Sequence, residues 1–173
     1  MNMKKAAKAV RKEKNLFMKK DRNSPLTSYQ KKLFKKLRYF PYDPKYRFEG
    51  SIEEFEDKAE IEIATNKGEM RKYRLFGKFS FEVNGQQLVL HIFQSLDGDF
   101  FFVPFVDGTS GKETYGAGRY AELEEIAPQK WVLDLNYAYN PYCAYNDKWI
   151  CPLVPPINRL AIRVEAGEKT FAE

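Results

Sequence analysis

Apolar positions in the first twenty residues recur at helical spacing. Ala6 and Val10 are four residues apart and Phe17 follows seven residues later, which places all three on one face of a helix. Lysines fill the other faces. This pattern predicts an amphipathic N-terminal helix that turns Ala6, Val10 and Phe17 toward the rest of the protein.

A second, shorter helix is expected after a Ser-Pro break. Thr27 and Gln30 have the spacing of a capping box, in which the two residues satisfy each other's backbone N–H groups at a helix start. Pro41 and Pro44 end this helical region, because proline lacks a backbone donor and clashes inside a helix. The pattern predicts one or two helices within residues 1–44.

From about residue 46 the pattern changes to alternation, which is typical of strands. The strongest signal is Asn84-Gly85, a dipeptide that favours a two-residue hairpin turn because both positions tolerate positive φ. It joins two strand-like stretches, residues 71–83 and 86–94, and Gly77 marks a bend in the first of them.

A two-residue turn fixes the register of this hairpin. Phe81 then lies opposite Leu88 and Phe79 opposite Leu90, so that one face is apolar and forms core. The other face carries His91 and is only partly polar, and the N-terminal helices are expected to cover it.

Further strands are expected along the rest of the chain, at residues 99–106, 119–123, 130–136 and 158–165. Short strands joined in sequence order indicate an antiparallel meander, which protects its edges by closing into a small barrel or by folding over as a sandwich. The expected fold is mainly β in an α+β arrangement, with a β domain over residues 45–173 and the basic helical region of residues 1–44 packed against it as one folding unit.

The charge of the chain is distributed unevenly. The formal net charge is +5, yet residues 1–47 carry +13 and residues 48–173 carry −8. The basic helices therefore have an acidic partner within the same chain. Nucleic-acid binding is not favoured, because the lysines lack interleaved arginines and aromatic residues. No apolar run is long enough to span a bilayer and no secretory signal is recognised, so we expect a cytoplasmic protein; its oligomeric state stays open.

Two cysteines, Cys143 and Cys151, are the only thiols. In a reducing compartment they are expected to be free, whereas an oxidising one would allow a disulfide. Catalysis by a cysteine and a histidine is disfavoured, because His91 is the only histidine and the hairpin register directs it toward Lys78. The spacing matches no zinc motif, so no metal site is predicted, and any cofactor stays undetermined.

A glycine-rich stretch resembles a phosphate loop but departs from it. Glu113 follows the Gly-Lys pair where Ser or Thr is required, and Val106 stands where a glycine is needed. Downstream, Gly116 and Gly118 precede Arg119, whose planar guanidinium suits a carboxylate or phosphate. The alternative is a bulge beside a structural arginine paired with a carboxylate.

The tract over residues 131–156 mixes tyrosines, amides and prolines. Asp134 and Asn136 are two residues apart in an expected strand and so share a face, with Asn140 and Tyr145 following. Aromatic walls with a few polar groups are typical of a small-molecule pocket. The alternative is a long ordered loop whose amides bond their own backbone. Acid–base chemistry would need two carboxylates brought together, and the candidates near the tract are Asp107, Glu113, Asp134, Asp147 and Glu168.

Several stretches of the chain resemble a family of bacterial and archaeal proteins catalogued as domain of unknown function 1684. They are SPL at 24–26, FVPFVDGTSG at 102–111, ETYGAGRY at 113–120, DLNYAYNPYCAY at 134–145, CP at 151–152, PINRL at 156–160 and AGEK at 166–169. One departure is Leu135, where the family pattern leads us to expect Phe. The resemblance implies that the glycine-arginine stretch and the Asn-Pro-Tyr-Cys tract are shared features, either of a site or of a structural network, and implies no particular activity.

The sequence therefore favours a module that binds a small ligand, which could be anionic, in a pocket of the β-rich domain. An enzyme that uses the same pocket is the first alternative, with Asp134 or Cys143 as the reacting group. An interaction module that docks a partner on the basic helices is the second. The candidate binding residues are Arg119, Asp134, Asn136, Asn140, Tyr145 and Arg159.

Overall fold

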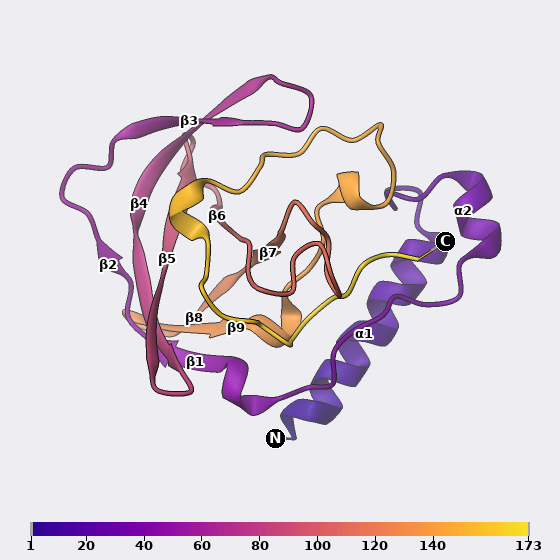
Figure 1. The fold of residues 1–173 in the computed structure, drawn as a ribbon, viewed down its shortest axis with the longest axis horizontal. Helices are drawn as coiled ribbons and strands as arrows, with labels where there is room; N and C mark the ends of the chain where they lie inside the picture. The colour runs from indigo at the N-terminus through magenta and orange to yellow at the C-terminus, as the bar shows by residue number, and fades with distance from the viewer. Residues whose placement is uncertain (1, 173) are drawn as a thin grey trace.

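An N-terminal helix lies beside two antiparallel sheets in the computed structural model, which describes residues 2–172 (Figure 1). The larger sheet has the order β2-β4-β5-β6-β7, and β3 also pairs with β4. Its strands are β2 (Glu53–Glu54), β3 (Glu60–Ala64), β4 (Met70–Val83), β5 (Gln86–Ser95), β6 (Phe101–Phe105) and β7 (Arg119–Ala121). The smaller sheet has the order β1-β9-β8, with β1 (Arg47–Gly50), β8 (Leu123–Ala127) and β9 (Lys130–Asp134).

The two sheets share one apolar core. Phe79, Phe81 and Leu90 of the larger sheet pack in one cluster with Leu133 of β9 and with Leu135, which directly follows β9. All five are 5% exposed or less. The α+β class is confirmed, and the arrangement is sandwich-like. Of the two forms expected from the sequence, the closed barrel is absent from the described part of the chain.

The β4–β5 hairpin has the register that the sequence predicts. Phe81 pairs with Leu88 and Phe79 with Leu90. The turn residues Asn84 and Gly85 have φ of 50° and 80°, as a two-residue hairpin turn requires. The predicted bend is also confirmed: the register shifts between Leu75 and Gly77, and a Cβ at Gly77 would lie 2.4 Å from the Glu53 carbonyl oxygen. Glycine is needed there because the β2 backbone approaches so closely.

The helices begin where expected, but the first one buries a different face. α1 spans Met3–Lys20 and α2 spans Ser28–Leu33, with both halves of the Thr27–Gln30 capping box formed. Phe17 packs against a buried cluster as expected, but Val10 is 45% exposed, and the buried positions of α1 are Ala7 and Met18. The buried face is rotated by one residue because Arg11 and Lys14 bond groups of the β domain.

A second expectation is also wrong, since α1 does not cover the His91 face of the hairpin. Figure 1 shows α1 on the opposite side of the molecule from β4 and β5. Beside His91 lies instead the short 3-10 helix η4 (Pro156–Asn158). Within the described residues, no helix is long and apolar enough to cross a membrane.

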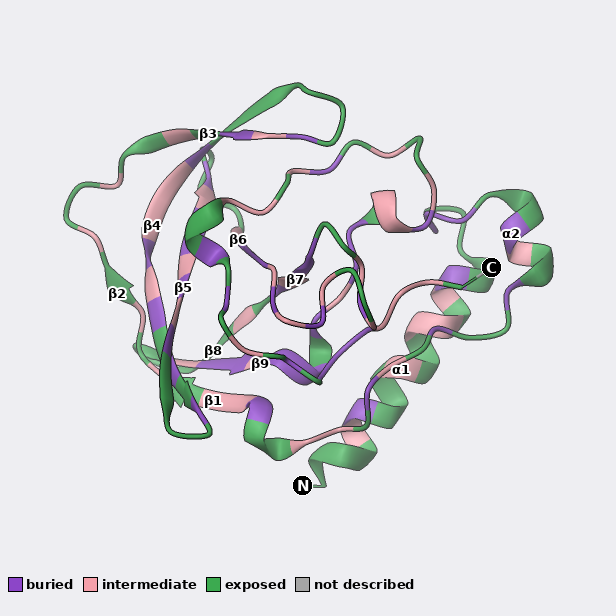
Figure 2. Ribbon diagram, viewed as in Figure 1, coloured by how far each residue is buried: buried purple, intermediate pink, exposed green. Residues whose placement is uncertain are grey.

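Residues 158–165 were expected to form a strand and do not. Asn158 lies at the end of η4, and its side chain accepts a hydrogen bond from His91 N (2.8 Å) and donates to His91 O (2.9 Å) and Pro104 O (2.8 Å). This amide therefore bridges β5 and β6 where the two strands have separated. Buried and exposed positions still alternate along this segment, although it forms no strand (Figure 2).

Candidate functional site

Arg119 is the largest side chain that is fully buried. It lies at the start of β7, and its guanidinium donates to three carbonyl oxygens of one extended segment: Val164 at 3.1 Å, Glu168 at 3.2 Å, and Ala166. These carbonyls alternate along the chain, as the bonding groups on one edge of a strand do. The guanidinium thus takes the place of a neighbouring strand.

The charge of Arg119 is balanced by Asp107. The two side chains are 3.4 Å apart and neither is exposed. Burial lowers the pKa of Arg119, and the Asp107 carboxylate acts in the opposite direction. Asp107 also accepts from Val164 N (2.7 Å) and from the hydroxyl of Thr109 (2.8 Å). Both charges are therefore satisfied within the protein.

The glycine before Arg119 has a structural reason. Gly118 has a φ of 101°, and a Cβ there would come 2.5 Å from the Phe105 carbonyl oxygen. The rest of the glycine-rich turn is closed by the Thr109–Thr114 hydroxyl contact at 2.9 Å. Glu113 pairs with Arg163 at 2.6 Å. The threonine hydroxyls of this turn thus bond each other, and the Glu113 carboxylate bonds Arg163.

Asp134 and Asn136 meet, but not as neighbours on a strand. β9 ends at Asp134, and Asn136 lies in the 3-10 helix η2 (Leu135–Tyr137). The Asn136 amide donates to Asp134 Oδ1 (2.9 Å) and to Asp43 O (2.8 Å), and it accepts from Asp43 N (2.9 Å). The Tyr42 hydroxyl donates to Asp134 at 3.2 Å. Asn136 therefore fixes the chain that enters 3-10 helix η1 (Pro44–Tyr46) against the end of β9.

Asn140 and Tyr145 converge on Glu168. This carboxylate is fully buried and accepts from Asn140 N (3.3 Å), Asn140 Nδ2 (3.2 Å) and the Tyr145 hydroxyl. The fourth partner is Lys14 of α1, whose Nζ lies 2.7 Å from Glu168 Oε2. Burial, and next the Glu168 charge, raise the pKa of Tyr145 far above its ordinary value, so its hydroxyl stays protonated and donates.

Lys14 is the member of this cluster that sequence reasoning missed. A signal existed, because Lys14 follows Ala7 by seven residues and precedes Met18 by four, which is the spacing of a helical face. Arg159, by contrast, is exposed after η4 and takes no part in these networks. Of the six candidates, the structure brings Asn140 and Tyr145 together on Glu168, pairs Asp134 with Asn136, and buries Arg119 beside the same C-terminal segment.

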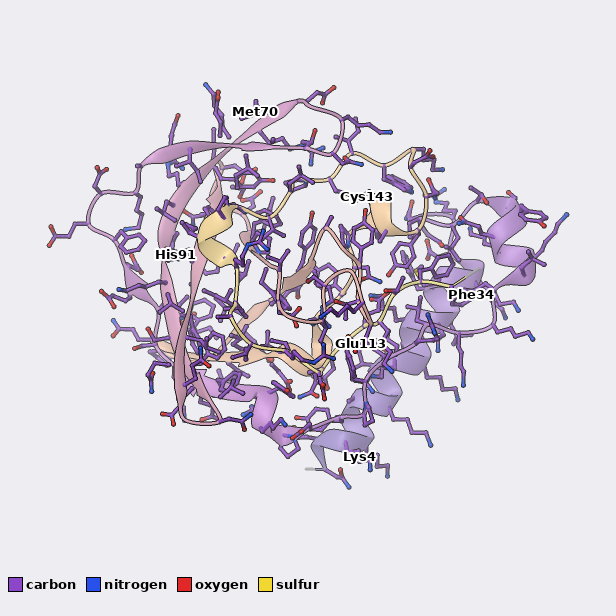
Figure 3. The ribbon with its side chains drawn as sticks, in the orientation of Figure 1. Lys4, Phe34, Met70, His91, Glu113 and Cys143 are labelled. Atoms are coloured by element: carbon purple, nitrogen blue, oxygen red, sulfur yellow. The ribbon has the colours of Figure 1, made fainter. Side chains whose placement is uncertain are left out.

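The two cysteines lie close to each other and far from the histidine. The Cys143 backbone N–H donates to Cys151 Sγ at 3.4 Å. Figure 3 shows His91 and Cys143 in separate parts of the molecule. Among residues 2–172, no group of three or more histidine, cysteine or acidic residues could hold a metal ion.

One groove is lined by apolar side chains together with charged ones. It has a volume of about 800 Å³ and lies between α1 and the smaller sheet. Apolar side chains come from both walls, and charged ones and two tyrosines surround them. Its lining residues are Met3, Ala6, Val10, Lys14, Arg47, Glu122, Leu123, Glu124, Ile126, Val132, Asp134, Tyr137 and Tyr139. Asp134 is the one predicted site residue that reaches this groove.

These features define an α+β protein with a two-sheet core, a buried polar network around its C-terminal segment, and a groove between helix and sheet. The chain belongs to the family described as Protein of unknown function (DUF1684), whose pattern matches residues 32–169. It is similar to an uncharacterized protein of Haloarcula marismortui solved by solution NMR, with 36% sequence identity over 98% of this chain and 95% of that one and a TM-score of 0.74. A comparison with curated protein sequences gave no match.

Proposed function

We propose that the protein binds a small molecule in the groove between α1 and strands β8 and β9. The observation that carries this proposal is the groove itself. Its volume of about 800 Å³ lies within the range of about 300–1,000 Å³ that ligand pockets occupy. Its apolar lining residues include Val10 and Ile126, which are 45% and 43% exposed. Large apolar side chains left open to water beside polar groups are what a ligand with an apolar body can cover.

The charges around the groove favour a ligand with a cationic group. Three carboxylates line it, those of Glu122, Glu124 and Asp134, against the two cations of Lys14 and Arg47. Lys14 is paired with Glu168 at 2.7 Å and Arg47 with Glu49 at 2.9 Å, so both cations already have partners. Carboxylates in a groove that also holds an exposed tyrosine suit an amine, which gains from ion pairing and from the ring face.

Arg119 has no place in this proposal. Its guanidinium faces Asp107 and three backbone carbonyls in a fully buried position, so an anionic ligand would have to displace protein groups to reach it. The anionic ligand suggested by the sequence rested on this side chain. We therefore replace it with an amphipathic amine as the ligand class.

Titration of the labelled protein with octylamine tests this proposal by NMR, with octanoate as the matched control of opposite charge. Backbone signals of β8, β9 and the N-terminal half of α1 should shift with octylamine and much less with octanoate. Equal shifts with both probes would contradict the cationic preference. Shifts spread over the whole chain, or none at the groove, would contradict the site.

Variants at two isoleucines of similar exposure distinguish binding in the groove from adsorption to the surface. Ile126 lines the groove at 43% exposure, and Ile157 lies outside it at 50% exposure. Ile126→Ser should weaken octylamine binding about fivefold, since removing roughly 1 kcal/mol of apolar contact changes an affinity by that factor. Ile157→Ser should leave the affinity unchanged. The same loss in both variants would refute binding in the groove.

A further inference from the structure

Cys143 and Cys151 come from separate segments and meet at one point. Cys143 lies in the 3-10 helix η3 (Tyr142–Ala144), and Cys151 lies in the irregular stretch that follows. The backbone N–H of Cys143 donates to Cys151 Sγ at 3.4 Å, and the Tyr115 hydroxyl lies 3.8 Å from Cys143 Sγ. The sulfur of Cys151 therefore contacts the backbone of Cys143, and the Cys143 thiol is its hydrogen-bond partner.

Both cysteines are held in position by their own backbone contacts. Cys151 N donates to Asn66 Oδ1 at 2.9 Å, and Asn66 N donates to Cys151 O at 3.1 Å, which ties Cys151 to the turn between β3 and β4. On the other side, Ala144 N donates to Pro141 O at 3.0 Å and closes the turn that carries Cys143. Backbone hydrogen bonds thus hold both segments in place, and the two thiols face each other.

The surroundings make one thiol a much stronger acid than the other. The hydrogen bond from the Cys143 thiol, followed by the backbone N–H groups of Cys143 and Tyr142 and by the charge of Arg71, lowers the pKa of Cys151 to about 6. The same pairing, together with burial, raises the pKa of Cys143. The Cys151 sulfur, which accepts the Cys143 backbone N–H, is therefore the better placed of the two to carry a thiolate.

We propose that Cys143 and Cys151 form a redox-active dithiol that reduces small hydroperoxides, with Cys151 as the attacking thiolate and Cys143 as the resolving thiol. The substrate class follows from access: Cys151 is 8% exposed, which admits a small peroxide more readily than a bulky disulfide. The site lies apart from the α1 groove, so it stands whether or not the groove binds a ligand.

The reaction consumes one hydroperoxide and two thiols. Cys151 Sγ attacks the terminal peroxide oxygen, the O–O bond breaks, and the leaving alkoxide takes a proton from solvent, which leaves a sulfenic acid on Cys151. Cys143 then attacks Cys151 Sγ and expels hydroxide, which takes the Cys143 proton and leaves as water. Two thiols are oxidised to one disulfide while one hydroperoxide is reduced to an alcohol and water. A dithiol such as dithiothreitol reverses the sulfur step.

The test is oxidation of the reduced full-length chain with hydrogen peroxide, followed by alkylation and intact-mass measurement. The expected product has lost two hydrogen atoms and accepts no alkyl group, and it recovers both thiols after dithiothreitol. The native chain should react at least about tenfold faster than the chain in urea, because only the folded protein stabilises the thiolate. Two thiols that stay open to alkylation, or a native rate no faster than the unfolded one, would overturn the proposal.

Serine variants assign the two roles, and circular dichroism confirms that each is folded. Cys143→Ser should stop at the sulfenic acid on Cys151, which dimedone traps. Cys151→Ser should give at least about tenfold less dimedone adduct at the same peroxide dose, because burial keeps the remaining Cys143 thiol protonated and therefore a poor nucleophile. Dimedone labelling that survives in Cys151→Ser and vanishes in Cys143→Ser would contradict the assignment.

Discussion

At the scale of single residues, the Arg119 side chain connects the start of β7 to the C-terminal segment. Its donors bind the carbonyls of Val164, Ala166 and Glu168, and its charge faces Asp107. Because a buried carboxylate without its cation is costly, the pair matters more for stability than its separate hydrogen bonds suggest.

Replacing Arg119 with Met should therefore destabilise the fold strongly. The Arg119→Met variant leaves the Asp107 carboxylate buried without a cation, and we expect the free energy of unfolding to fall by about 3–5 kcal/mol. Urea denaturation followed by tryptophan fluorescence measures the change. Arg163→Met is the control, since Arg163 pairs with Glu113 on the surface, and its effect should be much smaller. Similar losses in both variants would refute the role given to Arg119.

The sequence allowed two interpretations of Arg119, a ligand-binding residue or a structural arginine paired with a carboxylate, and could not decide between them. Asp107 is twelve residues away and the carbonyl partners more than forty, so only the folded chain brings them together. Asn136 and Asn140 illustrate the same limit: their residue types indicate directional hydrogen bonds, but the partners at Asp43 and Glu168 are distant in sequence. The choice between a site and a structural network depends on those partners.

At the scale of elements, α1 is attached by charged side chains as well as by apolar ones. Its inward face presents Arg11 and Lys14 between Ala7 and Met18, with Arg11 lying 4.4 Å from the centre of the Tyr39 ring. The helix and its amphipathic character were predictable from spacing alone. The orientation of α1 could not be predicted, because a pattern read from apolar residues alone places every lysine and arginine on the solvent side.

Lys14 offers a direct test of how α1 is attached. Lys14→Met keeps most of the apolar stem but leaves the buried Glu168 without its cation, so we expect a loss of about 2 kcal/mol in unfolding free energy. Lys12→Met is the matched control, because Lys12 is exposed on the same helix. Chemical denaturation of both variants gives the comparison. A Lys14 variant as stable as its control would mean that apolar contacts alone hold α1 in place.

The β hairpin was the most predictable element because its information is local. The Asn-Gly turn fixes the register, and the register separates the two faces. Residues 158–165 do not form a strand because their backbone pairing is limited to isolated contacts just beyond β6: Leu160 N donates to Val106 O at 2.8 Å, and Gly108 N donates to Ile162 O at 2.7 Å. Farther along, the carbonyl of Val164 accepts from the Arg119 guanidinium and not from a backbone N–H.

At the scale of the whole molecule, one histidine makes the stability depend on pH in a defined direction. Burial, and next the charge of Lys78, lower the pKa of His91. The unfolded chain therefore takes up a proton at its ordinary pKa of about 6.5, before the folded chain does, and the contribution of neutral His91 is lost as the pH falls from that value toward the lower pKa of the folded chain.

The His91→Gln variant isolates this effect. The free energy of unfolding of the native chain should fall more steeply between about pH 7.5 and 5.5 than that of the variant, since the variant lacks the only imidazole. Denaturation at each pH measures both curves, and their difference removes contributions shared by the carboxylates and by Cys151. Parallel curves would show that His91 titrates alike in the folded and unfolded chains.

The contact between Lys14 and Glu168 also sets an order of events during synthesis, because 154 residues separate the two partners. At roughly 5–20 residues per second, a ribosome adds Glu168 about 8–30 s after Lys14. During that interval Lys14 has no carboxylate partner, and the α1 segment cannot dock in its final position. The chain therefore closes its fold only after nearly all of it has left the ribosome.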